Sequence, residues 1–147
     1  MKIANLENEK MFAELGLKLG ENKNVKVWLE QPTRSTEKVN ADYCIFAKYE
    51  DSEGRRTQDL LGVPDKLGNI TGLNLKAWIG SIVSQHPELE GTNLTDIVNS
   101  LLKAPMTCTV YVTENTGANG KTYKNNSLRK PIEVAELAEF EEVILEN

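Results

Sequence analysis

The segment GANGKT, at positions 117–122, is the part of the sequence closest to a catalytic motif, because it ends in the Gly-Lys-Thr of a nucleotide-binding loop. Such a loop needs a glycine five positions before Gly120, where this chain has Asn115. It also needs a following helix whose N-terminal N–H groups bind phosphate, whereas both flanks of this segment have strand character. We therefore interpret it as a hairpin turn with Asn119 and Gly120 at its tip, and not as an ATP site.

Other residues that could support catalysis lack the spacing that catalysis requires. His86 is the only histidine, and no serine or cysteine stands at a nucleophile–histidine motif spacing from it. Cys44 and Cys108 are far apart in strand-like runs, so we expect two buried, reduced thiols, with a disulfide or a reactive thiol as the alternative. The carboxylates and cysteines form no metal-ligand pattern. The sequence favours a protein that is not an enzyme and uses no cofactor or metal, with an enzyme of dispersed catalytic groups as an alternative.

Basic and aromatic residues alternate on several strand-like segments, which is an arrangement that binds single-stranded nucleic acid. Lys26 and Trp28 should share one strand face, and Lys121 and Tyr123 should share another. Aromatic rings stack on bases at about 1–3 kcal/mol each, and basic side chains contact phosphates. The alternative for each ring is packing in a core or over a sheet. The predicted nucleic-acid-binding residues are Lys26, Trp28, Arg34, Arg55, Arg56, Tyr111, Lys121, Tyr123, Lys124, Arg129 and Lys130.

Charge is distributed unevenly along the chain. The net charge is −5, from 17 basic and 22 acidic residues, and residues 131–147 contain six glutamates and no base. The rest of the chain is close to neutral, so its charge is compatible with nucleic-acid binding but does not indicate it. Apolar residues alternate with the glutamates, so we predict a partner-binding tail with contacts at Phe140, Glu141, Glu142 and Ile144. The alternatives are a solvating tail, a last helix packed on the body, and a segment that competes with nucleic acid for the basic face.

Apolar periodicity predicts the elements that must position these residues. A short helix is expected within residues 1–20, and the sequence ENKN at 21–24 is typical of a turn. Apolar residues at i, i+3, i+4 and i+7 predict two helices within an insertion over residues 74–104, the first with Asn74 as its N-cap. Alternation of period two predicts strands over 25–30, 40–50, 55–63, 107–113 and 121–125.

Five strands with helices between the third and the fourth have the order of an OB-fold barrel, although other small barrels share it. We therefore expect a β-rich α+β fold, a five-stranded OB-fold-like barrel with a helical insertion between strands 3 and 4 and an acidic C-terminal segment. The length fits one binding domain over residues 1–130, followed by the tail. No apolar run is long enough to cross a bilayer, and the first ten residues lack the apolar core of a signal peptide, so we expect a cytoplasmic protein.

The span from Val25 to Arg129 resembles the small phage-encoded single-stranded DNA-binding proteins that assist replication and recombination. The resemblance rests on the first strand pair, the helix with LKAWIGSI at 75–82, and the hairpin MTCTVYVTENTGANGKTYKNNSLRKP at 106–131. It implies an OB-fold that binds single-stranded DNA with little sequence preference. The contacts that it implies are Lys121 and Tyr123 of the hairpin and Trp28 of the first strand.

The leading hypothesis is a non-catalytic protein that coats or transfers single-stranded DNA in the host-cell cytoplasm, as a homo-oligomer that supports phage replication or recombination. Proteins of those pathways are the expected partners of the acidic tail. The alternative is a protein-binding module, such as a phage inhibitor that binds a host enzyme through its acidic surface. The sequence leaves DNA and RNA equally open, because both offer phosphates and stackable bases.

Overall fold

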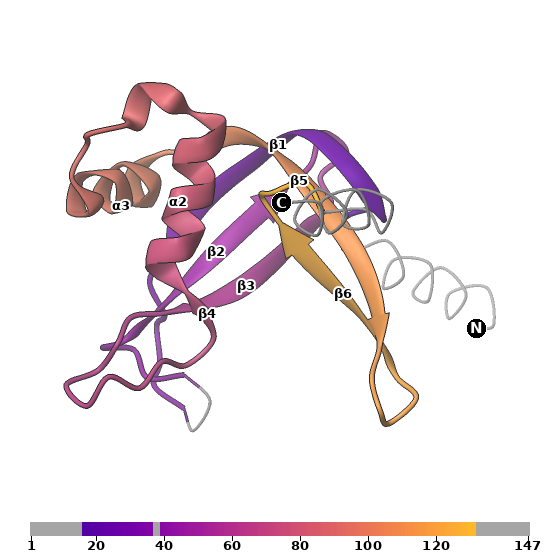
Figure 1. Cartoon of the computed structure of the whole chain (residues 1–147), viewed down its shortest axis with the longest axis horizontal. Helices are drawn as coiled ribbons and strands as arrows, with labels where there is room; N and C mark the ends of the chain where they lie inside the picture. The colour runs from indigo at the N-terminus through magenta and orange to yellow at the C-terminus, as the bar shows by residue number, and fades with distance from the viewer. Residues whose placement is uncertain (1–15, 37–38, 132–147) are drawn as a thin grey trace, which may run out of the picture.

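The computed structural model describes residues 16–36 and 39–131, which form a curled six-stranded mixed sheet with two α-helices (Figure 1). The strand order is β4-β3-β2-β1-β5-β6, and the sheet curves into a half-barrel. The β-rich, barrel-like fold expected from the sequence is confirmed at this level. The sixth strand arises because the two-residue β4 adds in parallel to the end of β3. Two residues are too few to show an alternating pattern, which is why periodicity missed β4.

Most elements lie close to their expected positions. In chain order they are β1 (Gly20–Glu30), β2 (Cys44–Glu50), β3 (Arg56–Gly62), β4 (Leu73–Asn74), α2 (Leu75–Gln85), the 3-10 helix η1 (Pro87–Leu89), α3 (Leu94–Lys103), β5 (Met106–Thr116) and β6 (Thr122–Ser127). The helix predicted over 1–20 falls mainly on residues 1–15, which lie outside the described residues, as does the tail over 132–147. Residues 16–20, which are described, are not helical.

Strand β1 belongs to both halves of the curled sheet. Its N-terminal part pairs with β5 and its C-terminal part pairs with β2, both antiparallel. The register with β5 shifts between Asn22 and Val25, and Asn24 has a positive φ of 60°. The turn predicted at 21–24 is therefore wrong. These polar residues form a bulge inside a continuous strand, because pairing with β5 satisfies backbone groups that a turn would leave to solvent.

Both helices begin at asparagine caps and pack their apolar faces against the inner face of the sheet. The Asn74 side chain accepts a hydrogen bond from the Ala77 N–H at 3.2 Å, and Asn93 accepts one from the Thr95 N–H at 2.8 Å. The two predicted helices are thereby confirmed. A single core combines helix and strand residues, among them Ile79, Ile82, Ile97 and Leu101 of the helices and Val25, Val27, Leu29, Cys108, Val110 and Val112 of the strands.

The C-terminal end of α2 occupies the edge of β5 beyond the point where β6 stops. The Gln85 amide accepts a hydrogen bond from the Thr109 N–H at 2.7 Å, and it donates to the Thr109 carbonyl at 2.7 Å and to the Leu128 carbonyl at 2.6 Å. His86 Nε2 lies 2.7 Å from the Thr107 carbonyl oxygen. The Gln85 side chain thus takes the place of a strand partner and fixes α2 to the sheet.

Replacing Gln85 with alanine should lower the free energy of unfolding by about 2 kcal/mol, because the half-buried N–H and carbonyl of Thr109 lose their partner. Urea denaturation measures this change. The matched control is Ser84→Ala at the neighbouring exposed position, which we expect to stay within about 0.5 kcal/mol of the parent protein. Equal stabilities of the two variants would show that water replaces the amide at no cost.

A chain of hydrogen bonds crosses the inside of the half-barrel from α2 to β6. Trp78 Nε1 donates to the Tyr49 hydroxyl at 2.9 Å, and that hydroxyl donates to Asp59 Oδ2 at 2.9 Å. Asn126 Nδ2 donates to the other oxygen of Asp59 at 3.4 Å. Strands β3 and β6 are not neighbours in the sheet, so the contact between Asp59 and Asn126 joins two edges that strand pairing does not connect.

Stability should fall with rising pH through the titration of Asp59. Burial raises the pKa of this carboxyl above its ordinary value, and it outweighs the hydrogen bonds from Tyr49 and Asn126, which lower it. The folded state therefore favours the neutral acid. The contribution of the Asp59 carboxyl to the free energy of unfolding is complete below its pKa in the unfolded state, about 3.9. This contribution is lost as the pH rises through the raised pKa in the folded state.

The variant Asp59→Asn keeps a neutral side chain that can accept from Tyr49 at every pH. The difference in unfolding free energy between this variant and the parent should be smallest below about pH 4 and should increasingly favour the variant towards neutral pH. Thermal and urea unfolding at several pH values measure it. A difference that does not change with pH would mean that Asp59 has the same pKa in the folded and unfolded states.

Cys44 and Cys108 are both buried and form no disulfide, so the prediction of reduced thiols is confirmed. Burial raises the pKa of the Cys108 thiol to about 11, which keeps it neutral and unreactive at neutral pH. Within residues 16–36 and 39–131, no helix has the length and apolar character that a membrane crossing requires.

Candidate nucleic-acid interface

Trp28 lies on the outer face of the sheet, where β1, β2 and β3 run side by side. It stands opposite Lys48 of β2, which in turn stands opposite Gln58 of β3. The neighbouring row on this face consists of Lys26, Glu50 and Arg56. We call the group of Lys26, Trp28, Lys48 and Arg56 the Trp28 patch. The predicted placement of Lys26 and Trp28 on one face, opposite buried Val25, Val27 and Leu29, is confirmed.

Two surface pockets flank the half-buried Trp28 side chain. One, of about 310 Å³, is lined by Trp28 together with Lys48, Arg56 and Gln58. The other, of about 250 Å³, lies between Trp28 and the C-terminal end of α3 at Leu101–Pro105. A half-buried ring that lines two pockets can contact a planar ligand without moving out of the fold. This arrangement suits stacking by a base, with cationic groups within reach of the adjoining phosphates.

The charges of the patch are partly balanced by acids on the same face. The Arg56 guanidinium pairs with Glu50 at 3.1 Å and remains largely exposed, and Glu30 lines the larger pocket. Lys48 is hydrogen-bonded to Gln58, and its ammonium lies 5.4 Å from the centre of the Phe46 ring. Sequence reasoning missed Lys48 and Phe46, although the alternation of β2 places both on the outer face. The strand was predicted over residues 40–50 without an assignment of its faces.

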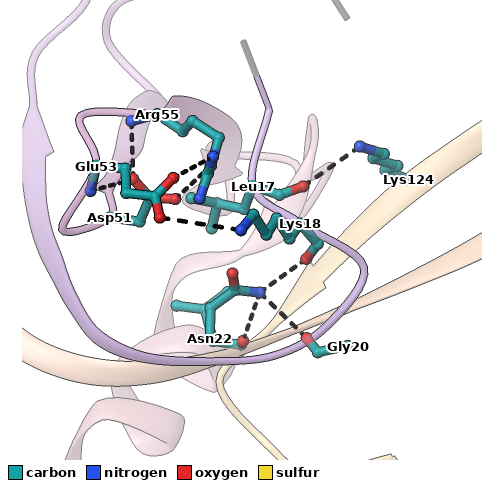
Figure 2. A network of polar contacts seen from close by, with 9 residues as sticks. Leu17, Lys18, Gly20, Asn22, Asp51, Glu53, Arg55 and Lys124 are labelled. Carbon is teal, nitrogen blue, oxygen red and sulfur yellow. Dashed lines mark hydrogen bonds and ion pairs between the residues drawn. The ribbon is translucent and has the colours of Figure 1, made fainter. Parts of the chain in front are cut away.

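Arg55 and Lys124 make polar contacts within the protein (Figure 2). The Arg55 guanidinium pairs with Asp51 at 2.7 Å and with Glu53 at 2.6 Å. The Lys124 ammonium donates to the carbonyl of buried Leu17 at 3.3 Å. Figure 2 shows these contacts on either side of the segment that leads into β1. Both residues were predicted to bind nucleic acid, and in the structure their charged groups are engaged in these contacts.

Tyr111, Arg129 and Lys130 lie together beside α2, away from the Trp28 patch. They line an open groove of about 610 Å³, with Ser84, Gln85 and Thr109 on its other walls. Arg129 Nε donates to the Ser81 hydroxyl of α2 at 3.1 Å. Tyr111 is on the outer face of β5, opposite the buried face formed by Cys108, Val110 and Val112, as predicted. We call this site the Arg129 groove.

The β5–β6 hairpin extends beyond the rest of the sheet and carries Lys121 and Tyr123 near its tip (Figure 1). Tyr123 is 49% exposed, and its hydroxyl accepts a hydrogen bond from Asn119 Nδ2 at 2.9 Å. Gly120 has a φ of 78°, so GANGKT is a turn between two strands and the interpretation as a hairpin is confirmed. Lys121 belongs to the turn and not to β6. Arg34 is exposed on the connection between β1 and β2.

The structure does not bring the three predicted aromatic residues together. Val27 stands opposite Met106, so Trp28 is level with the start of β5. Tyr111 is farther along β5. Tyr123 of β6 stands opposite Asn115, which is farther along β5 again. At about 3.3 Å per residue, Tyr111 is about 20 Å and Tyr123 about 33 Å from Trp28 along the strands. No single base can contact two of these rings.

Within residues 16–36 and 39–131, no group of three or more histidine, cysteine, aspartate or glutamate side chains is placed to hold a metal ion. Comparison of the whole chain with protein-family models, with curated proteins and with solved structures finds no match in any of the three. The function must therefore be inferred from the fold and the geometry of these sites.

Proposed function

We propose that this protein binds single-stranded DNA with little sequence preference and without catalysis, and that its half-barrel is an OB-fold. The observation that carries the proposal is Trp28, a half-buried tryptophan that lines two pockets and has cations around it. Strand β1 is shared by both halves of the sheet, and the helices come between β3 and β5, which supports the OB-fold assignment. In that fold, the outer face of the second and third strands is a surface that binds oligonucleotides.

Base stacking and phosphate contacts contribute different parts of the proposed affinity. Base stacking on Trp28 supplies affinity without sequence preference, because every base has a π-face. Lys26, Lys48 and Arg56 contact phosphates and make the affinity depend on salt. Three phosphate contacts correspond to a slope of about −2 in a plot of log K against log salt concentration. We extend the proposal, from the resemblance noted in the sequence, to a homo-oligomer that supports phage replication or recombination in the host cytoplasm.

Titration of labelled oligo-dT of roughly 20–30 nucleotides at two salt concentrations tests the proposal, with fluorescence anisotropy and tryptophan emission as readouts. Trp78 is buried in the core, so quenching on binding should come from Trp28. We expect affinity that weakens with salt and quenching that disappears in Trp28→Phe. Absence of binding at low salt, in the full chain and after removal of residues 132–147, would exclude the proposed function.

A second candidate function, docking on another protein, is favoured by the loop that leads from β3 to β4. Its exposed apolar side chains are Val63, Leu67 and Ile70, with Leu67 87% exposed, and exposed Leu73 follows as the first residue of β4. The Asp65 carboxylate accepts from the backbone N–H groups of Leu67 and Asn69 and so fixes the tip. Removal of residues 132–147 separates the two functions. It should preserve or raise DNA affinity if the protein binds DNA, and abolish capture of a partner if the acidic tail is the docking element. Capture that survives removal of the tail but is lost in Leu67→Asp would assign docking to the loop between β3 and β4.

A further inference from the structure

The Arg129 groove has the properties of a site for a phosphate chain. Its walls combine the hydroxyl groups of Ser84 and Thr109 with the side chains of Arg129 and Lys130 and the ring of Tyr111. Among the described residues, no carboxylate lines the groove and none forms an ion pair with Arg129 or Lys130. The Trp28 patch, in contrast, has two acids beside it, Glu30 and Glu50. A pair of cations with no acidic partner in residues 16–36 and 39–131 can attract an anionic ligand to a polar groove.

Arg129 is held in place before any ligand binds. Its Nε is bound to the Ser81 hydroxyl at 3.1 Å, and the Ser127 hydroxyl both accepts from the Arg129 N–H at 3.1 Å and donates to its carbonyl at 3.0 Å. The guanidinium passes over Gly80 of α2, and a side-chain methyl group added at Gly80 would lie 3.7 Å from Arg129 Nη2. Within the part of the chain that the structure describes, its terminal nitrogens have no hydrogen-bond partner, and arginine favours two parallel hydrogen bonds to a phosphate.

The outer faces of β1 and β5 connect the groove to the Trp28 patch. Lys26 of the patch stands opposite Thr107 of β5, and Thr109 and Tyr111 follow on the same face towards the groove. This path covers about 20 Å of strand from Trp28 to Tyr111. Glu21, which stands opposite Tyr111, is an exposed acid beside the path. The two sites therefore belong to one outer surface and are not on opposite sides of the protein.

We propose that one DNA strand occupies both sites, crossing from the Trp28 patch over the outer face of β5 into the Arg129 groove. Arg129 and Lys130 bind phosphates there, and Tyr111 stacks on a base. The inference rests on the proposed function and adds a second contact region, which only an oligonucleotide long enough to span both sites can use. Short oligonucleotides bind at the Trp28 patch alone.

The test compares oligo-dT of about 3 and about 15 nucleotides on the full chain, by anisotropy over a range of salt concentrations. Arg129→Ala should weaken binding of the long oligonucleotide about fivefold or more and reduce the salt slope by about 0.7. It should leave binding of the short one within about twofold. Lys66→Ala, which removes one positive charge from the loop between β3 and β4, is the matched control and should change neither affinity by more than about twofold.

A second variant excludes loss of folding as the explanation, because it should increase affinity. Glu21→Gln removes the acid beside Tyr111 and should tighten binding of the long oligonucleotide about twofold, with no change for the short one. Equal effects of Arg129→Ala and Lys66→Ala on the long oligonucleotide would overturn the inference while leaving the proposed function intact. Equal loss for both lengths would also overturn it, because Arg129 would then belong to the first contact. If neither length binds the parent protein, the proposed function itself fails.

Discussion

Replacing Trp28 with alanine should weaken binding of a short oligo-dT by at least tenfold. Stacking of a base on an aromatic ring contributes about 1–3 kcal/mol, and 1.4 kcal/mol corresponds to a factor of ten. Trp28 lines two pockets and has Lys48 and Arg56 beside it, so its loss removes the central contact of the proposed interface. Anisotropy with labelled oligo-dT of about 3 nucleotides measures the change.

Tyr123→Ala is the matched control, because Tyr123 is an exposed ring on the hairpin, about 33 Å from Trp28 along the strands. It should leave affinity for the short oligonucleotide within about twofold. Trp28→Phe should recover part of the affinity, since a smaller ring still stacks. Thermal unfolding of each variant identifies losses that come from the fold. Full affinity in a folded Trp28→Ala protein would exclude the Trp28 patch as the binding site.

Replacing Tyr49 with phenylalanine should lower the free energy of unfolding by about 2–4 kcal/mol. The Tyr49 side chain is fully buried, and its hydroxyl is the acceptor for Trp78 and the donor to Asp59. Removal of one oxygen leaves a buried indole N–H and a largely buried carboxylate without this partner, at about 1–3 kcal/mol each. Burial also raises the pKa of Tyr49, so the hydroxyl stays protonated and remains a donor throughout the ordinary pH range.

Urea denaturation measures this effect, and Tyr111→Phe makes the same deletion on the outer face of the sheet as a control. The control should change stability by less than about 0.5 kcal/mol. Combining Tyr49→Phe with Asp59→Asn tests the coupling between the Tyr49 hydroxyl and the Asp59 carboxyl. When the hydroxyl donor is lost, a neutral amide at position 59 lowers stability less than a carboxylate does. The double variant should therefore be more stable than Tyr49→Phe alone at neutral pH. A Tyr49→Phe protein as stable as the parent would mean that water replaces the hydroxyl.

The helices and the alternating strands could be predicted from the sequence because they depend on local interactions. Asn74 and Asn93 bond to N–H groups within three residues of themselves, and apolar side chains at helical spacing define one face wherever the helix packs. The alternation in β1 and β5 likewise identified which residues face the core. The glycine-containing turn of the β5–β6 hairpin needed only Gly120 with its positive φ. For these elements, neighbours in the sequence carry the information.

The composition of the candidate sites depended on partners that are distant in the sequence. Alternation placed Trp28 on an outer face, but only the pairing of β1 with β2 and the position of α3 made two pockets beside it. The pattern could not show that Lys124 would bond to Leu17. The polar segment at 21–24 became part of a strand because β5 lies beside it. A residue's type and spacing determine which way it faces, whereas its charge partners, its burial and the space around it are set by the long-range packing that only the tertiary structure contains.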